Sequence, residues 1–189
     1  MKRAKSVLNP KNEDLIVRIR LRTQNLFLTK QLMCAESVLT VLNQGLSGGM
    51  PMEMAVRLAS GLPEGLGGSG CTCGSLTGGV LALGLFLGRS GPGFRNGKPA
   101  MFSAKALHGQ FKDRFGATCC RVLTKDLKWG SKEHFQKCSL RAGFSAEMSA
   151  RLILQKKPEI IYQADDSYLG QQDSMFAAGL KKMANTILR

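Results

Sequence analysis

Apolar side chains recur along most of this chain at the three- and four-residue spacing of amphipathic helices. Clusters of glycine, proline and serine separate the periodic segments and indicate where helices end. Residues 14–23 alternate apolar and basic side chains as a half-buried strand does, but Leu26, Phe27 and Leu32 resume a helical spacing. The pattern therefore predicts an all-α fold, with irregular structure at 159–166 and helices over residues 13–29, 32–43, 52–60, 72–88, 100–115, 120–126, 132–154 and 168–188.

The helix predicted over residues 72–88 contains Gly74, Gly78, Gly79 and Gly84 before its last residue, Gly88, and each interior glycine costs about 1 kcal/mol in an exposed helix. We therefore expect a buried, glycine-rich central helix, the most buried in the molecule, whose glycines let neighbouring backbones approach closely. The segment before it, residues 61–70, has five glycines and one proline and is predicted to be a loop.

A chain of 189 residues with 43% hydrophobic side chains can form one compact multi-helix domain. We divide it into a basic tail (residues 1–12), a helical domain (13–157) and a C-terminal helical extension (158–189). The longest apolar run, residues 80–87, is too short to cross a bilayer. No apolar run precedes Pro10 as in a secretory signal, so we expect a cytoplasmic protein in a reducing compartment.

The formal net charge of +14 is concentrated in two regions. The first 30 residues hold eight basic and two acidic side chains, and residues 101–157 hold twelve and four. Such a field favours anionic partners, and we expect a partner protein of acidic character. A nucleic-acid or acidic-protein binding module is an alternative, but aromatic residues are only 6% of the chain and no recognition motif is present, which argues against nucleic acid.

The candidate functional residues are the six cysteines of the chain: Cys34, Cys71, Cys73, Cys119, Cys120 and Cys138. In a reducing compartment, clustered cysteines are more often metal-binding or catalytic than disulfide-bonded. Cys71 and Cys73 lie in a glycine-rich segment just before a predicted helix, where backbone amides and the helix dipole lower the pKa of a thiol. No paired-carboxylate or Ser-His-Asp pattern indicates hydrolysis.

Four segments of the chain resemble a family of small redox-active proteins named for a Cys, Cys-Gly-Ala-x-x-Gly, Cys, Cys pattern. The first is Met33-Cys34-Ala35-Glu36-Ser37-Val38, and the second is Cys73-Gly74-Ser75-Leu76-Thr77-Gly78, with serine in place of alanine. The third is Cys120-Arg121-Val122-Leu123-Thr124, and Cys138 supplies the fourth cysteine. The resemblance covers about residues 14–155.

The resemblance implies redox activity or electron transfer through Cys34, Cys73, Cys120 and Cys138, with Cys71 and Cys119 as secondary candidates. A similar helical domain occurs in an unusual dihaem cytochrome that also has an iron–sulfur centre. By that analogy the four cysteines are expected to be the metal ligands of an iron–sulfur cluster. Haem is not expected, because the chain has no Cys-x-x-Cys-His sequence.

Two other thiol functions stay open at this point. A metal-free dithiol that cycles through a disulfide needs only two of the cysteines. A structural zinc site needs four, although a domain of this size can be stable without one. We interpret His108, His134 and Trp129 as surface or packing residues rather than as ligands or stacking platforms.

Overall fold

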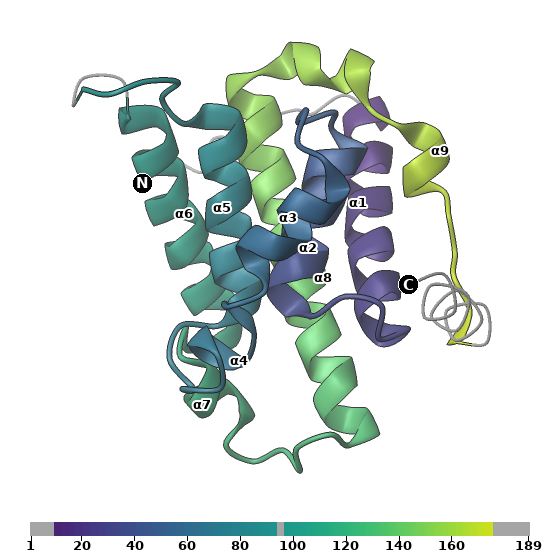
Figure 1. Cartoon of the computed structure of the whole chain (residues 1–189), viewed down its shortest axis with the longest axis vertical. Coiled ribbons are helices and arrows are strands. Elements are labelled where there is room, and N and C mark those ends of the chain that lie inside the picture. Colours follow the sequence, from purple (N-terminus) through teal and green to yellow (C-terminus); the bar gives the residue numbers. More distant parts are fainter. Residues whose placement is uncertain (1–9, 94–96, 176–189) are drawn as a thin grey trace.

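The computed structural model describes residues 10–93 and 97–175, and within these ranges the regular structure is helical, which confirms the predicted fold class (Figure 1). In chain order the elements are α1 (Pro10–Leu28), α2 (Cys34–Gly45), α3 (Met52–Ala59), α4 (Pro63–Leu66), α5 (Gly74–Leu87), α6 (Lys98–Phe115), α7 (Cys120–Thr124), α8 (Lys132–Lys156), the 3-10 helix η1 (Pro158–Gln163) and α9 (Asp166–Leu169). The described ranges contain one isolated antiparallel bridge, between Thr72 and Cys119.

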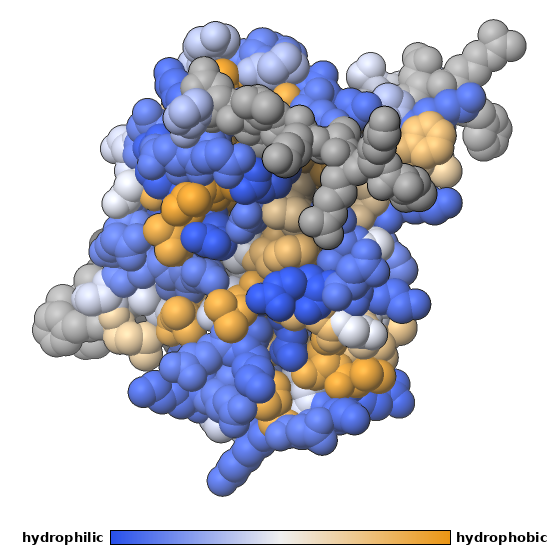
Figure 2. Space-filling model, turned by 180° about the vertical axis from the view of Figure 1, so that it is seen from behind, coloured by the Kyte–Doolittle hydropathy of each residue, from blue (hydrophilic) through white to orange (hydrophobic). Residues whose placement is uncertain are grey.

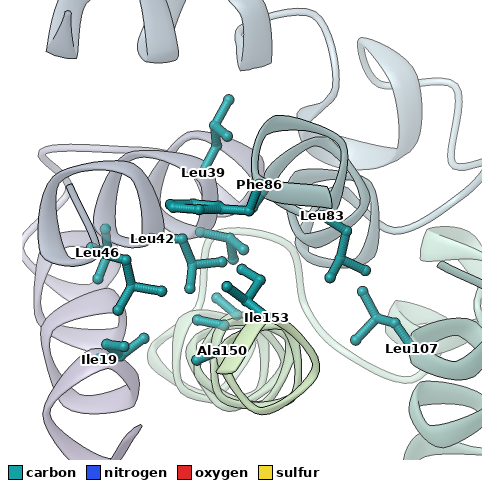
Figure 3. Packing of buried hydrophobic residues seen from close by; sticks show 14 of the residues in the cluster. Ile19, Leu39, Leu42, Leu46, Leu83, Phe86, Leu107, Ala150 and Ile153 are labelled. Carbon is teal, nitrogen blue, oxygen red and sulfur yellow. The ribbon is translucent and has the colours of Figure 1, made fainter. Parts of the chain in front are cut away.

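The long helix α8 organises the domain, because α1, α2, α5 and α6 all pack against it. Helix α3 lies on the outer side of α2, and the small helices α4 and α7 lie together at the lower end of the molecule in Figure 1. The core between α1, α2, α5 and α8 is mostly aliphatic, with Leu42, Leu83 and Ile153 fully buried and Phe86 packed among them (Figure 3). Burial of these side chains provides the main driving force for packing the helices.

Helix ends agree with the sequence pattern where a local signal fixes them. The predicted N-cap Ser131 begins α8, and its Oγ accepts a hydrogen bond from the backbone N–H of His134 at 3.1 Å. Helix α5 begins at Gly74, two residues later than predicted, and Cys73 is its N-cap residue. The predicted loop over residues 61–70 contains the short turn α4, in which Glu64 has a φ of 58°.

Close backbone contact explains the glycines at the start of α5. A Cβ atom on Gly78 would lie 2.5 Å from the carbonyl oxygen of Ala35 in α2. A Cβ atom on Gly79 would lie 2.6 Å from Oγ of Ser145 in α8. Helix α5 is not the most buried helix, however, since Val80, Leu81 and Gly84 are exposed, whereas α2 is buried at ten of its 12 residues.

The predicted helix over residues 168–188 is wrong in its described part. Helix α9 ends at Leu169, and residues 170–174 are not helical. Arg22 of α1 holds this segment, because its guanidinium donates to the Asp173 carboxylate at 2.8 Å and to the Gln171 carbonyl at 3.2 Å. Because these hydrogen bonds join residues that are far apart in the sequence, the helical periodicity of residues 168–188 could not predict them. Residues 176–189 lie outside the described ranges.

Hydrophilic side chains cover much of the face seen from behind in Figure 2, with smaller hydrophobic areas between them. Among the described residues, no helix combines the length and the apolar character needed to span a membrane.

The contact between Gly78 and Ala35 makes the first prediction. Gly78→Ala should destabilise the protein by about 1–3 kcal/mol, because the added methyl group meets backbone atoms that cannot move independently, and Gly78→Leu should cost more. Gly84→Ala is the matched control: its Cβ meets nothing within 4 Å, so the better helix propensity should stabilise by about 0.5–1 kcal/mol. Urea denaturation measures both changes. Equal effects at the two positions would contradict the close-contact interpretation.

Candidate functional site

Four cysteines from four helices line one cavity of about 240 Å³ at the end of the domain formed by α4, α7 and the first turns of α8. Cys34 is the first residue of α2, Cys73 is the N-cap of α5, Cys120 is the first residue of α7, and Cys138 lies in the second turn of α8. The structure thus brings together four residues that are separated by up to 104 positions in the sequence, from 34 to 138.

The antiparallel bridge between Thr72 and Cys119 explains why Cys120 rather than Cys119 faces the cavity. The Cys120 N–H donates to the Cys71 carbonyl and the Cys73 N–H donates to the Thr118 carbonyl, so the two segments run side by side. Side chains alternate between the two faces of such a pair, which places Thr72 and Cys119 opposite Cys73 and Cys120. The structure therefore places Cys120 on the cavity wall, and not Cys119.

The secondary candidates lie outside the cavity lining. Cys71 is exposed, and the Cys119 thiol donates to the Gly70 carbonyl at 3.0 Å. All six cysteines are free thiols.

Gly74 explains why a glycine follows Cys73. A Cβ atom at position 74 would lie 2.5 Å from Sγ of Cys34 and 3.1 Å from the Leu62 carbonyl oxygen. The sulfur of Cys34 therefore occupies the space that a side chain at position 74 would need. Gly65 has a similar role beside α7, because its Cβ would lie 2.8 Å from Cβ of Cys120 and its φ is +73°. Both glycines let thiols approach neighbouring backbone.

The cavity disfavours charged thiolates in the metal-free state. Burial, followed by the proximity of Cys73, raises the pKa of Cys34 to about 12, although backbone hydrogen bonds from Glu64 and Ala35 oppose this. Burial and then Cys73 and Cys138 raise the pKa of Cys120 to about 11. Burial also raises the pKa of Cys138, against the charge of Arg141. These thiols are therefore protonated at neutral pH, and each is close enough to influence the others.

A buried cation lies beside these thiols. Arg141 is only 7% exposed, and it donates from Nη1 to Sγ of Cys138 at 3.6 Å and from Nη2 to the Leu123 carbonyl at 2.7 Å. Its Nε has no partner, and none of the described carboxylates forms an ion pair with it. Buried charges are normally paired, so this guanidinium favours negative charge on the nearby sulfurs.

Ser75 contributes a second unsatisfied donor. The residue lines the cavity and is 1% exposed, and its hydroxyl has no hydrogen-bond partner among the described atoms. A buried hydroxyl without a partner costs about 1–3 kcal/mol. An acceptor in the cavity would remove this cost.

The opposite wall of the cavity is largely aromatic and apolar. Trp129 is 55% exposed, and its ring stacks 4.3 Å from the ring of His134, which is buried. Nδ1 of His134 accepts a hydrogen bond from the Gly130 N–H at 3.3 Å, and burial followed by the charge of Arg141 lowers the pKa of His134. The remaining lining residues on this side include Phe27, Lys30, Gln31, Leu32, Met33 and Phe135.

Four cysteines are a donor set that either a single zinc ion or an iron–sulfur cluster can take. Zinc in a four-cysteine site has Zn–S distances of about 2.3 Å, which draws the sulfurs around a point. Among the described residues, no three Cys, His, Asp or Glu side chains are grouped in that way. Instead the four thiols line a cavity together with Ser75, whose hydroxyl has no partner among the described residues, and Arg141 donates to one of these thiols, that of Cys138. Cysteine thiolates are the usual ligands of iron–sulfur clusters.

Sequence reasoning identified the four cysteines but missed Arg141, Ser75 and Glu64. Arg141 had a usable signal, since it follows Cys138 by three residues and so shares its helix face. The contact of Glu64 with Cys34 depends on a left-handed turn that no periodicity indicates.

Comparison with known proteins gives one match. A family model described as "Putative redox-active protein (C_GCAxxG_C_C)" matches residues 32–152 and so includes all four cavity cysteines. In this chain the glycine of the second element, Gly74, comes after its cysteine. No curated protein and no solved structure matches the chain significantly.

The raised thiol pKa values predict how the stability of the reduced, metal-free protein depends on pH. The pKa of Cys34 rises from an ordinary value of 9.0 to about 12 on folding, so its contribution to stability is complete below about pH 9 and is lost as pH rises toward 12. The urea midpoint should therefore fall between pH 8 and pH 11 less steeply in Cys34→Ala than in the wild type. Cys71→Ser, which removes an exposed thiol outside the cavity, should keep the wild-type slope. Identical slopes in all three proteins would contradict the burial argument.

Proposed function

Because this chain belongs to the redox-active C_GCAxxG_C_C family, we propose that it is an electron-transfer protein whose cavity binds an iron–sulfur cluster. Cys34, Cys73, Cys120 and Cys138 would be the ligands. The observation that carries the proposal is that these four thiols, and neither of the other two, line one mostly apolar cavity. When bound, such a cluster supplies one-electron transfer.

The charges around the cavity support a bound anionic sulfur centre. Metal ligation requires thiolates, whereas burial keeps Cys34 and Cys120 protonated in the metal-free protein. Four thiolates around a cluster leave net negative charge, which the buried guanidinium of Arg141 would offset. The same ligation would give the Ser75 hydroxyl a sulfur acceptor. Two unfavourable features, the buried charge of Arg141 without a described carboxylate partner and the unpaired hydroxyl of Ser75, would thus be relieved together.

A metal-free dithiol is less well supported by the same features. Thiol–disulfide exchange proceeds through a thiolate, and raised pKa values at Cys34, Cys120 and Cys138 keep the thiolate fraction small at neutral pH. The proposal includes a reducing compartment such as the cytoplasm, in which six free cysteines persist.

Anaerobic purification followed by iron, sulfide and zinc analysis tests the proposal. We expect iron and sulfide in similar amounts, a visible absorbance band, and loss of both in the Cys34→Ser, Cys73→Ser and Cys138→Ser variants, with helical circular dichroism retained. The matched controls Cys71→Ser and Cys119→Ser remove thiols outside the cavity and should keep the cluster. Zinc alone would indicate a structural site. A reversible thiol couple without metal would indicate the dithiol alternative.

Arg141 gives a second prediction for the loaded protein. Removing a buried positive charge next to Cys138 should make reduction less favourable, so Arg141→Gln should lower the reduction potential by roughly 50–100 mV. Lys156→Gln changes the charge equally on an exposed part of the same helix and should leave the potential nearly unchanged. Anaerobic redox titration of the visible band measures both. A potential unaffected in Arg141→Gln would show that the guanidinium does not act on the cluster.

A further inference from the structure

Trp129 connects the cysteine cavity with the outside of the protein. Its side chain forms part of the cavity wall and is also 55% exposed. Behind it lies the buried ring of His134, at 4.3 Å, which lines the same cavity. Trp129 and His134 thus form a short aromatic part of the cavity wall, with Trp129 on its exposed side. Large exposed aromatic side chains are enriched at the centres of protein interfaces.

The chain around Trp129 is strongly basic. Residues 121–137 contain five basic and two acidic side chains, and all seven are exposed. The two carboxylates are already paired, Asp126 with Lys125 at 3.9 Å and Glu133 with Lys137 at 3.4 Å. Lys128 and Lys132, within three positions of Trp129, form no ion pair with any described residue.

A third cation reaches the same place from another helix. Lys30 follows α1, lines the cavity and is exposed, and its Nζ lies 4.7 Å from the centre of the Phe135 ring. We call Lys30, Lys128, Trp129 and Lys132 the cationic rim. Among the described residues these three lysines have no carboxylate partner, and Lys30 lines the thiol cavity together with the exposed indole of Trp129. Positive charge at such a surface accelerates association with a negatively charged partner.

We propose that the cationic rim is the docking surface for an acidic one-electron carrier protein. The inference rests on the proposed function, because it assigns the partner of the same cysteine site. On docking, the reduced carrier would be oxidised by one electron, and the centre that the four cysteines would hold would be reduced by one. Trp129 and His134 are the lining residues that would connect the rim with that centre. No bond forms or breaks, and no proton has to move.

A protein partner fits this surface better than a nucleic acid. Single-stranded nucleic acids bind to several aromatic side chains on which successive bases stack. Here Trp129 is the one strongly exposed aromatic residue in the described part of the rim, while Phe102 and Tyr162 belong to other elements. In electron transfer, an indole on the wall of the thiol cavity would connect the bound partner with the cysteine site. Binding of a nucleic acid would not require this location.

The first measurement is binding, and it does not depend on a cluster. Trp129 is the only tryptophan of the chain, so its fluorescence reports contact at the rim directly. The probe is an oxidised, acidic plant-type [2Fe–2S] ferredoxin that lacks tryptophan, titrated into the full-length protein. We expect saturable quenching that weakens at least tenfold between about 50 and 500 mM salt. A 20-nucleotide single-stranded DNA is titrated in parallel.

Charge-reversal variants locate the surface. Lys128→Glu with Lys132→Glu should weaken ferredoxin binding about tenfold or more at low salt and have little effect at high salt. Lys156→Glu with Lys157→Glu is the matched control, because it reverses two exposed lysines at the other end of α8, about 36 Å away along a 25-residue helix. This control should stay within about twofold of the wild type. Equal effects of the two pairs would overturn the proposal, as would tighter binding of the DNA than of ferredoxin.

The second measurement is electron transfer from reduced ferredoxin, followed by stopped-flow absorbance under anaerobic conditions. Trp129→Ala should slow the second-order rate at least tenfold without changing the reduction potential or the iron content, and Trp129→Phe should restore most of it. An unchanged rate in Trp129→Ala would overturn the proposal. If the protein binds ferredoxin at the rim but contains no iron or sulfide, the proposed function has failed while the docking surface stands.

Discussion

The contact between the first turns of α2 and α5 is the constraint on which the rest of the site depends. Gly74 and Gly78 are four residues apart and so lie on one face of α5, where they meet Sγ of Cys34 and the backbone of Ala35. A side chain at either glycine would push the helices apart. Because both helices begin at this contact, their first residues bring Cys34 and Cys73 to the same cavity. The motif from Cys73 to Gly78 therefore determines how closely α2 and α5 pack, as well as where the thiols lie.

The remaining two cysteines reach the cavity by different means. Cys120 is placed by backbone pairing, since the Thr72–Cys119 bridge aligns the segment before α7 with the segment before α5. Cys138 is placed by its position on α8, whose register is set by a buried face against α1, α2 and α5. Four thiols thus arrive from three kinds of local structure. Cysteines that are dispersed in this way surround a cavity. A compact loop of cysteines would instead bring its sulfurs together within one turn.

The helices could be predicted from the sequence because their cause is local. Apolar periodicity and the Ser131 cap predicted α8, and the glycines of the helix after Cys73 indicated a close approach of neighbouring backbones. The contact between Arg141 and Cys138 could have been predicted from their three-residue spacing. That no described carboxylate pairs with Arg141 could not have been predicted in this way. The absence of such a partner depends on the side chains of all the elements that surround Arg141.

Other features needed the tertiary structure. The choice of Cys120 over Cys119 follows from which face of a two-stranded bridge each side chain takes, and the resemblance alone could not decide it. The end of α9 was missed because Arg22 and Asn25 hold residues 171–173 against α1. In both cases a long-range hydrogen bond decides between two conformations of similar local preference.

Helix α8 joins the chemistry of the site to the stability of the fold. His134, Cys138, Arg141, Ser145 and Ser149 follow one another at spacings of three and four residues and so form one continuous stripe. His134 and Cys138 line the cavity, Arg141 donates to the Cys138 sulfur, and the two serines pack against Gly79 of α5. Small side chains in the second half let α5 approach closely enough for Cys73 to reach Cys138. A larger residue at position 145 would displace α5 and, with it, the Cys73 thiol. The distance between the Cys73 and Cys138 sulfurs therefore depends on the packing of Ser145 against Gly79, two helical turns away from Cys138.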